Sequence, residues 1–221
     1  MNRSALARLL DHSVLKPESA LADVHAGADV VRQWAVGYYC VQPCWVADAV
    51  RDLAGTPARV IAVVAFPHGC SRPAVKALEA AAAVGEGARE IDMVINVGAL
   101  KSGYADVVRA DIDAVVRAVA GVPVKAILET AALTDDQKRL ACRLAVEAGA
   151  AFVKTSTGFH PSGGATPADV RLMRAEVGPA IGVKASGGVR TLADAQAMIA
   201  AGANRIGTSA TAAILAALPD A

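Results

Sequence analysis

Eight short apolar stretches recur along this chain, and a segment of helical character follows each of them. Each stretch has the length and the aliphatic content of a buried strand. The expected strands cover residues 11–16, 36–41, 59–66, 90–95, 122–128, 150–153, 181–184 and 204–207. The expected helices that follow them cover residues 18–34, 43–53, 72–84, 104–120, 134–149, 167–176, 191–201 and 209–218. This alternation predicts βαβ units and a parallel sheet.

The number of strands helps to select the arrangement of that sheet. Eight strand–helix pairs in 221 residues fit a closed (β/α)8 TIM barrel, with a short helix over residues 2–10 in front of it. The alternative is an open, doubly wound sheet, but no Gly-x-Gly-x-x-Gly fingerprint follows the first expected strand. No linker or low-complexity segment interrupts the pattern. We therefore expect a single α/β domain over residues 1–221.

Charge and composition argue against several classes of protein. Lys and Arg number 22 against 21 Asp and Glu, without a basic tract, so nucleic-acid binding has little support. No apolar run approaches the roughly 18 residues of a membrane helix, and the first residues do not resemble a signal peptide. The four cysteines form no dense framework, and no second pair completes a metal site with Cys40 and Cys44. We expect a cytoplasmic protein without a bound metal.

One lysine stands at an unusual place. Lys154 directly follows the apolar stretch 150–153 and precedes a loop rich in hydroxyl groups and glycine, which ends at a helix N-cap, Thr166. Lysine is almost never fully buried unless it is paired or takes part in chemistry. We therefore interpret Lys154 as a covalent nucleophile at the carboxyl end of a barrel strand.

The carboxyl ends of the expected strands bring further reactive side chains to the same edge of the barrel, where active sites of this fold lie. These residues are Asp11, Cys40, Asp92, Lys125, Lys154 and Lys184, of which Asp11, Cys40 and Lys125 are expected to contribute to substrate binding. Lys184 lies one βα unit after Lys154, so the two amines could converge. A second ammonium lowers the pKa of a neighbouring lysine, as does burial, and a neutral lysine attacks carbonyl groups to form a Schiff base.

Asp92 provides the general acid/base that such chemistry requires. An alternative is that Asp92 only neutralises the lysines in a structural ion-pair network. For Cys40, the wall of a pocket is favoured over a reactive thiol.

Two glycine-containing turns suggest an anion site. Gly187 and Gly188 follow the seventh expected strand, and Gly207 and Ser209 flank the end of the eighth. Glycines allow backbone N–H groups to approach an anion, helix dipoles add attraction, and phosphate sites after strands 7 and 8 are frequent in this fold. Ordinary turns are the alternative. Thr157 and Gly158 could add contacts from the sixth loop.

Several motifs, in order along nearly the whole chain, resemble those of the deoxyribose-phosphate aldolase family. The most specific are Lys-Thr-Ser-Thr-Gly at residues 154–158 and Lys-Ala-Ser-Gly-Gly-Val-Arg at residues 184–190. Others lie at residues 11–16, 40–43, 90–96 and 125–130. The resemblance implies a class I aldolase that cleaves 2-deoxy-D-ribose 5-phosphate reversibly to acetaldehyde and D-glyceraldehyde 3-phosphate, without metal or other cofactor.

By the same resemblance, Lys154 is the Schiff-base lysine, Lys184 tunes it, and Asp92 transfers protons. Gly187, Gly188, Gly207 and Ser209 would hold the phosphate. Ser13 stands where threonine is usual, and the sequence lacks the C-terminal tyrosine tail of some members. Water near Asp92 is then a candidate for protonating the enamine. The expected partners are small phosphorylated sugars and aldehydes, with a homodimer or homotetramer as the assembly. A phosphate-binding isomerase and a non-catalytic sugar-phosphate binding protein remain as alternatives.

Overall fold

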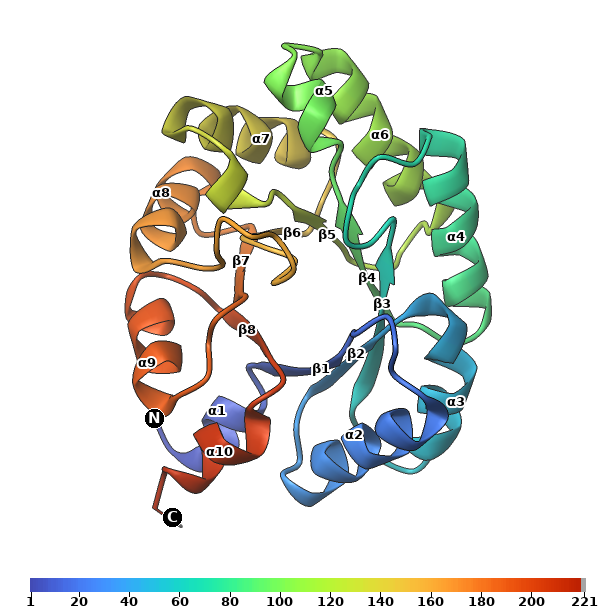
Figure 1. Cartoon of the computed structure of the whole chain (residues 1–221), viewed down its shortest axis with the longest axis vertical. Helices are drawn as coiled ribbons and strands as arrows, with labels where there is room; N and C mark the ends of the chain where they lie inside the picture. Colours follow the sequence, from blue (N-terminus) through green and yellow to red (C-terminus); the bar gives the residue numbers. More distant parts are fainter. Residues whose placement is uncertain (220–221) are drawn as a thin grey trace.

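Eight parallel strands close into a barrel in the order of the chain (Figure 1). The computed structural model describes residues 1–219. Closure is made by the first and last strands, where Leu10 pairs with Ile206 and His12 with Thr208. The strands are β1 (Leu10–Val14), β2 (Tyr38–Val41), β3 (Arg59–Val64), β4 (Glu90–Val94), β5 (Val124–Ile127), β6 (Phe152–Lys154), β7 (Gly182–Ser186) and β8 (Arg205–Thr208). The predicted (β/α)8 barrel is confirmed, and the open sheet is excluded.

The helices form a ring around the strands, and the first and last helices, α1 and α10, contact each other (Figure 1). The α-helices are α1 (Arg3–Ala7), α2 (Leu21–Gln33), α3 (Val46–Asp52), α4 (Pro73–Gly85), α5 (Val97–Lys101), α6 (Ala105–Ala118), α7 (Asp135–Glu147), α8 (Pro167–Val177), α9 (Leu192–Ala200) and α10 (Thr211–Ala216). Two 3₁₀ turns, η1 (Pro43–Trp45) and η2 (Thr130–Ala132), precede α3 and α7. Among residues 1–219, no helix combines the length and the hydropathy needed to cross a membrane. The end of the chain at residues 220–221, where a tyrosine tail was noted as missing, lies outside the described residues.

Element boundaries differ from the predicted ones for local reasons. The helix expected over residues 2–10 ends early because Leu10 already belongs to β1, where it is fully buried. The helix expected from residue 18 starts at Leu21, since a turn closed by the Ser19 N–H on the Lys16 carbonyl comes first. A further helix, α5, lies between the fourth strand and the next predicted helix, where no helix was assigned from the sequence; the Asn96 side chain accepts from the Ala99 N–H and caps it.

Side-chain alternation along the strands divides the protein into two layers. On β4, Ile91 and Met93 join the large apolar core shared with the helices. Within the barrel, a small apolar cluster fills the side formed by β2 and β3, with Leu15, Cys40, Ile61 and Val63 as its buried members. Buried charged side chains, with the rings of Tyr38 and Phe152 against them, lie elsewhere in the barrel interior. The core that stabilises the fold therefore lies outside the barrel, which leaves its interior for polar chemistry.

Candidate active site

Seven ionisable side chains from six strands point into the barrel, and none is more than 6% exposed. They are Asp11, Glu90, Asp92, Lys125, Lys154, Lys184 and Arg205. Five of them were predicted from the sequence, and Glu90 and Arg205 were not. The strand period could have identified Glu90, because it precedes Asp92 by two residues and its side chain therefore lies on the same face of the strand. We call these seven residues the charged cluster.

Asp92 is the centre of the charged cluster. Its Oδ2 accepts from Lys154 Nζ at 2.8 Å and from Lys184 Nζ at 2.7 Å. Its Oδ1 accepts from Lys125 Nζ at 2.9 Å. The two lysine amines that the sequence placed at neighbouring strand ends therefore do converge, on one carboxylate oxygen.

A second layer lies beneath this centre, toward the amino ends of the strands. Glu90 accepts from Lys125 Nζ at 2.5 Å and from Arg205 Nη1 at 3.1 Å. Arg205 also donates to Asp11 Oδ1 at 3.0 Å, and the other Asp11 oxygen contacts Lys184 Nζ. Ion pairs thus join all seven members into one network. Because a buried charge without a partner is costly, this pairing is what allows so many charges inside the barrel.

The pKa shifts separate the two converging lysines. Burial is the main cause that lowers the pKa of Lys154; the Asp92 carboxylate opposes this shift and the Lys184 ammonium adds to it. Burial would also lower the pKa of Lys184, but the carboxylates of Asp11 and Asp92 raise it instead. Like-charge repulsion, which the sequence analysis put first, is therefore the smaller cause at Lys154.

Charge counting agrees with this assignment. The charged cluster contains three carboxylates and four basic groups, so full ionisation leaves one excess positive charge. Burial would raise the pKa of Asp92, yet the ammonium groups of Lys125, Lys154 and Lys184 hold it well below its usual value. The cluster becomes neutral when one base loses its proton, and the lowered pKa marks Lys154 as a base that does so readily.

A cavity of about 690 Å³ opens above the charged cluster. Its wall includes Lys154 at the bottom and residues from the loops after β1, β6, β7 and β8. Among the described residues, Lys154 is the one member of the charged cluster that reaches this wall. Access to the cavity therefore distinguishes Lys154 from Lys125 and Lys184, the other two lysines of the charged cluster.

Glycines form one wall of this cavity. Gly187 and Gly188 have φ of +84° and +82°, a backbone conformation that L side chains rarely adopt. Within residues 1–219, the N–H groups of Gly158, Gly187, Gly188 and Ser209 donate no hydrogen bond to the protein. These free donors at the cavity are suited to an anion.

The amino end of α9, whose dipole was expected to attract the anion, is already capped by a carboxylate of the protein. The Asp194 carboxylate accepts from the N–H groups of Arg190 and Thr191 and closes a capping box with Thr191. Gly207 also has a packing role, because a Cβ there would lie 3.0 Å from Lys184 Cε and 2.9 Å from Ser186 Cβ. The glycine in β8 thus makes room for the Lys184 side chain.

Thr157 is held by a residue that the sequence analysis did not single out. Its N–H and its hydroxyl both donate to the buried Glu129 carboxylate, the hydroxyl at 2.5 Å. Glu129 itself has φ of +58° and lies in the loop after β5. This contact spans 28 residues of sequence, so no local pattern announces it. It fixes the loop that carries Gly158.

Three residues placed in the binding set by sequence lie beneath the cavity instead. Asp11, Cys40 and Lys125 are fully buried, and none contributes to the cavity wall in the part of the chain that the structure describes. Cys40 is therefore a core thiol and not part of the pocket wall, where it had been expected, and burial raises its pKa to about 11, which does not suit a reactive thiol. Thr157, Gly158, Gly187, Gly188, Gly207 and Ser209 do line the cavity.

Known proteins resemble this chain in both sequence and structure. The sequence profile of the DeoC/LacD family aldolases matches residues 6–217. Deoxyribose-phosphate aldolase of Enterococcus faecalis is 54% identical over 211 residues, which cover 95% of this chain and 96% of that protein. The enzyme of the same name from Bacillus subtilis is 52% identical, covering 93% and 92% of the two chains. A tetrameric deoxyribose phosphate aldolase from Aeropyrum pernix superimposes with a TM-score of 0.90 at 29% identity, covering 97% and 91%. The chain therefore belongs to the DeoC/LacD family of aldolases.

Proposed function

We propose that this aldolase cleaves 2-deoxy-D-ribose 5-phosphate reversibly to acetaldehyde and D-glyceraldehyde 3-phosphate through a Schiff base on Lys154. The observation that carries this proposal is the position of Lys154. Its amine has a lowered pKa and lies at the cavity wall, whereas Lys125 and Lys184 do not contribute to that wall. The names of the relatives support the substrate.

The first chemical step requires a neutral amine. An ordinary lysine has a pKa near 10.4, so only about one amine in two thousand is neutral at pH 7. The lowered pKa of Lys154 increases that fraction. Its nitrogen attacks the aldehyde carbon of the open-chain sugar, and the resulting carbinolamine loses water to give an iminium ion.

Asp92 and Lys184 act on the protons of these steps. Asp92 lies 2.8 Å from the Lys154 nitrogen, so its carboxylate can accept the proton that leaves this nitrogen on attack. Lys184, whose pKa is raised, stays protonated and keeps Asp92 ionised between turnovers. After the carbinolamine has lost water, the Asp92 carboxylate accepts the proton of the C3 hydroxyl group of the sugar. The C2–C3 bond breaks, D-glyceraldehyde 3-phosphate leaves, and the electron pair of the broken bond moves to the iminium, which becomes an enamine. Protonation of the enamine carbon by water and hydrolysis of the imine release acetaldehyde.

The phosphate end of the sugar lies against the glycine wall in this proposal. Gly158, Gly187, Gly188 and Ser209 offer free N–H donors there, and Gly207 also lines the cavity. An anion held by several preorganised N–H groups orients the substrate over Lys154.

A coupled assay for glyceraldehyde 3-phosphate released from deoxyribose 5-phosphate tests this function. We expect turnover by the parent protein, loss of turnover in Lys154→Met, and normal turnover in the surface control Lys101→Met. Isomerisation without acetaldehyde would instead identify a phosphate-binding isomerase. Ligand-induced stabilisation without any product would identify a binding protein.

Three further expectations belong to this proposal. We retain a single catalytic domain over residues 1–221. We retain a homodimer or homotetramer, supported by the tetrameric relative and testable by light scattering. The cytoplasm remains the expected compartment, and the four free cysteines suit a reducing environment.

A further inference from the structure

The phosphate of the proposed substrate carries charge that the glycine wall does not balance. The free N–H groups of the loops after β6, β7 and β8 are neutral donors. The amino end of α9 is already capped by the Asp194 carboxylate, so its dipole is engaged within the protein. Charge-assisted hydrogen bonds are about twice as strong as neutral ones, so a cationic side chain at the cavity would contribute substantially.

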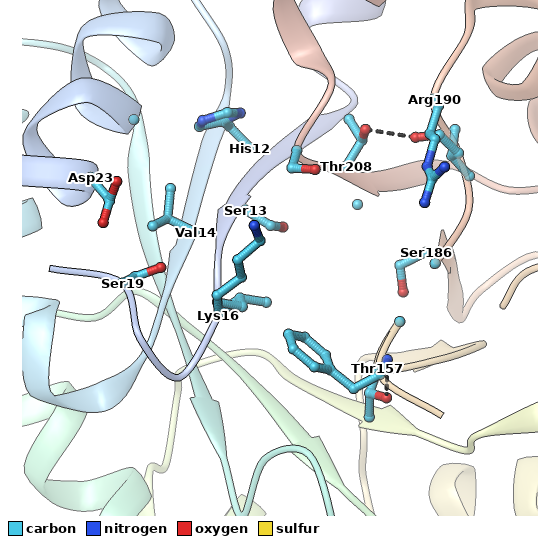
Figure 2. A pocket seen from close by; sticks show the side chains of 18 of the residues that line it. His12, Ser13, Val14, Lys16, Ser19, Asp23, Thr157, Ser186, Arg190 and Thr208 are labelled. Atoms are coloured by element: carbon cyan, nitrogen blue, oxygen red, sulfur yellow. Dashed lines mark hydrogen bonds between the residues drawn. The ribbon is translucent and has the colours of Figure 1, made fainter. Parts of the chain in front are cut away.

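Two exposed basic side chains reach the cavity from opposite walls. Arg190 follows the glycines of the β7 loop, and Lys16 comes from the loop between β1 and α2. Figure 2 shows Lys16 extending beside Ser13, across the cavity from Ser186 and Arg190. Within residues 1–219, neither Lys16 nor Arg190 has a side-chain hydrogen bond or ion pair.

The loop that carries Lys16 is anchored although the side chain is free. The Lys16 carbonyl accepts from the Ser19 N–H at 3.0 Å, and the Leu15 carbonyl accepts from Gln42 Nε2 at 2.9 Å. Glu18 lines the same cavity, but it forms no ion pair with Lys16 in the described structure. A fixed backbone with an unpaired ammonium directed into a cavity is the arrangement of a binding residue, not of a surface lysine.

We propose that Lys16 binds the phosphate of the substrate from the wall opposite the glycines and thereby sets the preference for phosphorylated sugars. This inference rests on the proposed function, whose substrate supplies the phosphate. Lys16 and Arg190 then place one positive charge on each side of the anion, and the glycine N–H groups supply the remaining hydrogen bonds.

The test compares two substrates that differ only in the phosphate. In Lys16→Met, we expect kcat/KM for 2-deoxyribose 5-phosphate to fall about tenfold or more, which is the usual loss for one charge-assisted hydrogen bond. The value for unphosphorylated 2-deoxyribose should stay within about twofold, since that sugar has no group for Lys16 to bind. Lys16→Arg should retain most of the activity on the phosphorylated substrate. The control Arg171→Gln removes one exposed charge on α8, outside the cavity, and should change neither value.

Equal losses for the two sugars would overturn the inference, because they would indicate a general structural role for the loop. Unchanged kinetics on both sugars would overturn it too. Calorimetric binding of inorganic phosphate separates this inference from the proposed function, because it does not require turnover. If the parent protein cleaved neither sugar, the proposed function would be wrong. Weaker binding of inorganic phosphate by Lys16→Met than by the parent would still support the phosphate-binding role of Lys16. Equal binding by the two proteins would refute that role.

Discussion

At the scale of single residues, Lys154 and Lys184 differ in the number of carboxylates that they contact, and their pKa values shift in opposite directions. Lys154 contacts one carboxylate, that of Asp92, whereas Lys184 contacts both Asp92 and Asp11. One carboxylate does not offset the cost of burying an ammonium, so the pKa of Lys154 falls. Two carboxylates more than offset it, so the pKa of Lys184 rises. Two lysines on adjacent strands thus have pKa values that are shifted in opposite directions.

The substitution Lys184→Met tests this view of Lys154. It removes a neighbouring positive charge and leaves Asp92 with one cation fewer, and both changes raise the pKa of Lys154. Because the neutral amine reacts, activity is lost below the pKa of Lys154. We therefore expect the acidic limb of the pH profile of kcat/KM to move to higher pH, by about one unit or more. An unmoved limb in a variant with a normal circular dichroism spectrum would refute the coupling.

At the scale of elements, the loops after β6, β7 and β8 are tied to one another before any ligand arrives. The Thr155 hydroxyl bridges to Ser186 in β7, and the Thr208 hydroxyl donates to the Val189 carbonyl. Within β8, Gly207 leaves the space through which the Lys184 side chain reaches Asp92. The position of the tuning lysine therefore depends on a glycine in the next strand.

Replacing that glycine should disturb catalysis. In Gly207→Ala, the new methyl group would press on Lys184 and Ser186, and overpacking of this kind usually costs about 1–3 kcal/mol. We expect kcat/KM to fall about tenfold or more, as a displaced Lys184 alters Lys154. The matched control is Gly85→Ala at the end of α4, where a Cβ meets nothing within 4 Å. The idea is wrong if both alanine variants keep full activity.

At the scale of the whole molecule, the two ends of the chain close the barrel together. β1 pairs with β8, and Arg3 of α1 donates to the Leu215 carbonyl of α10 at 3.0 Å. His12 of β1 contacts the Thr211 hydroxyl at 2.9 Å and stacks on Tyr39. Burial lowers the pKa of His12 to about 4, so the closed barrel holds a neutral imidazole at this junction.

This histidine gives stability a defined dependence on pH. Its folded pKa of about 4 lies below the ordinary value near 6.5, so the unfolded chain binds the proton first as pH falls. The contribution is complete above pH 6.5 and is lost progressively down to pH 4. We expect about 2 kcal/mol less stability at pH 5 than at pH 7 from this residue, measured by denaturant unfolding.

The control for this prediction is a second histidine. His12→Gln should flatten the pH dependence in this window, whereas His160→Gln, in the loop after β6, should leave it intact. A parent protein whose stability is constant between pH 7 and 5 would contradict the role given to His12.

Much of this architecture could be predicted because strand period and strand ends are local properties. The alternation of apolar stretches and helices determines the barrel, and converging strand ends bring Lys154, Lys184 and Asp92 together. Glu90 was missed because it lies at the start of its strand, whereas the site was predicted from the carboxyl ends of the strands alone. Glu129 was missed because its contact with Thr157 depends on two loops distant in sequence. The main cause of the lowered pKa of Lys154 was misjudged because the sequence does not show how deeply that amine is buried.

The central claim is that Lys154, and neither Lys125 nor Lys184, is the amine that reacts with the carbonyl group of the substrate. Reduction with borohydride in the presence of acetaldehyde at neutral pH, followed by peptide mass mapping, tests it directly. The account predicts the added mass of one ethyl group on Lys154, with Lys125 and Lys184 unmodified. Label on Lys184 instead of Lys154, or no label on any of the three, would contradict it.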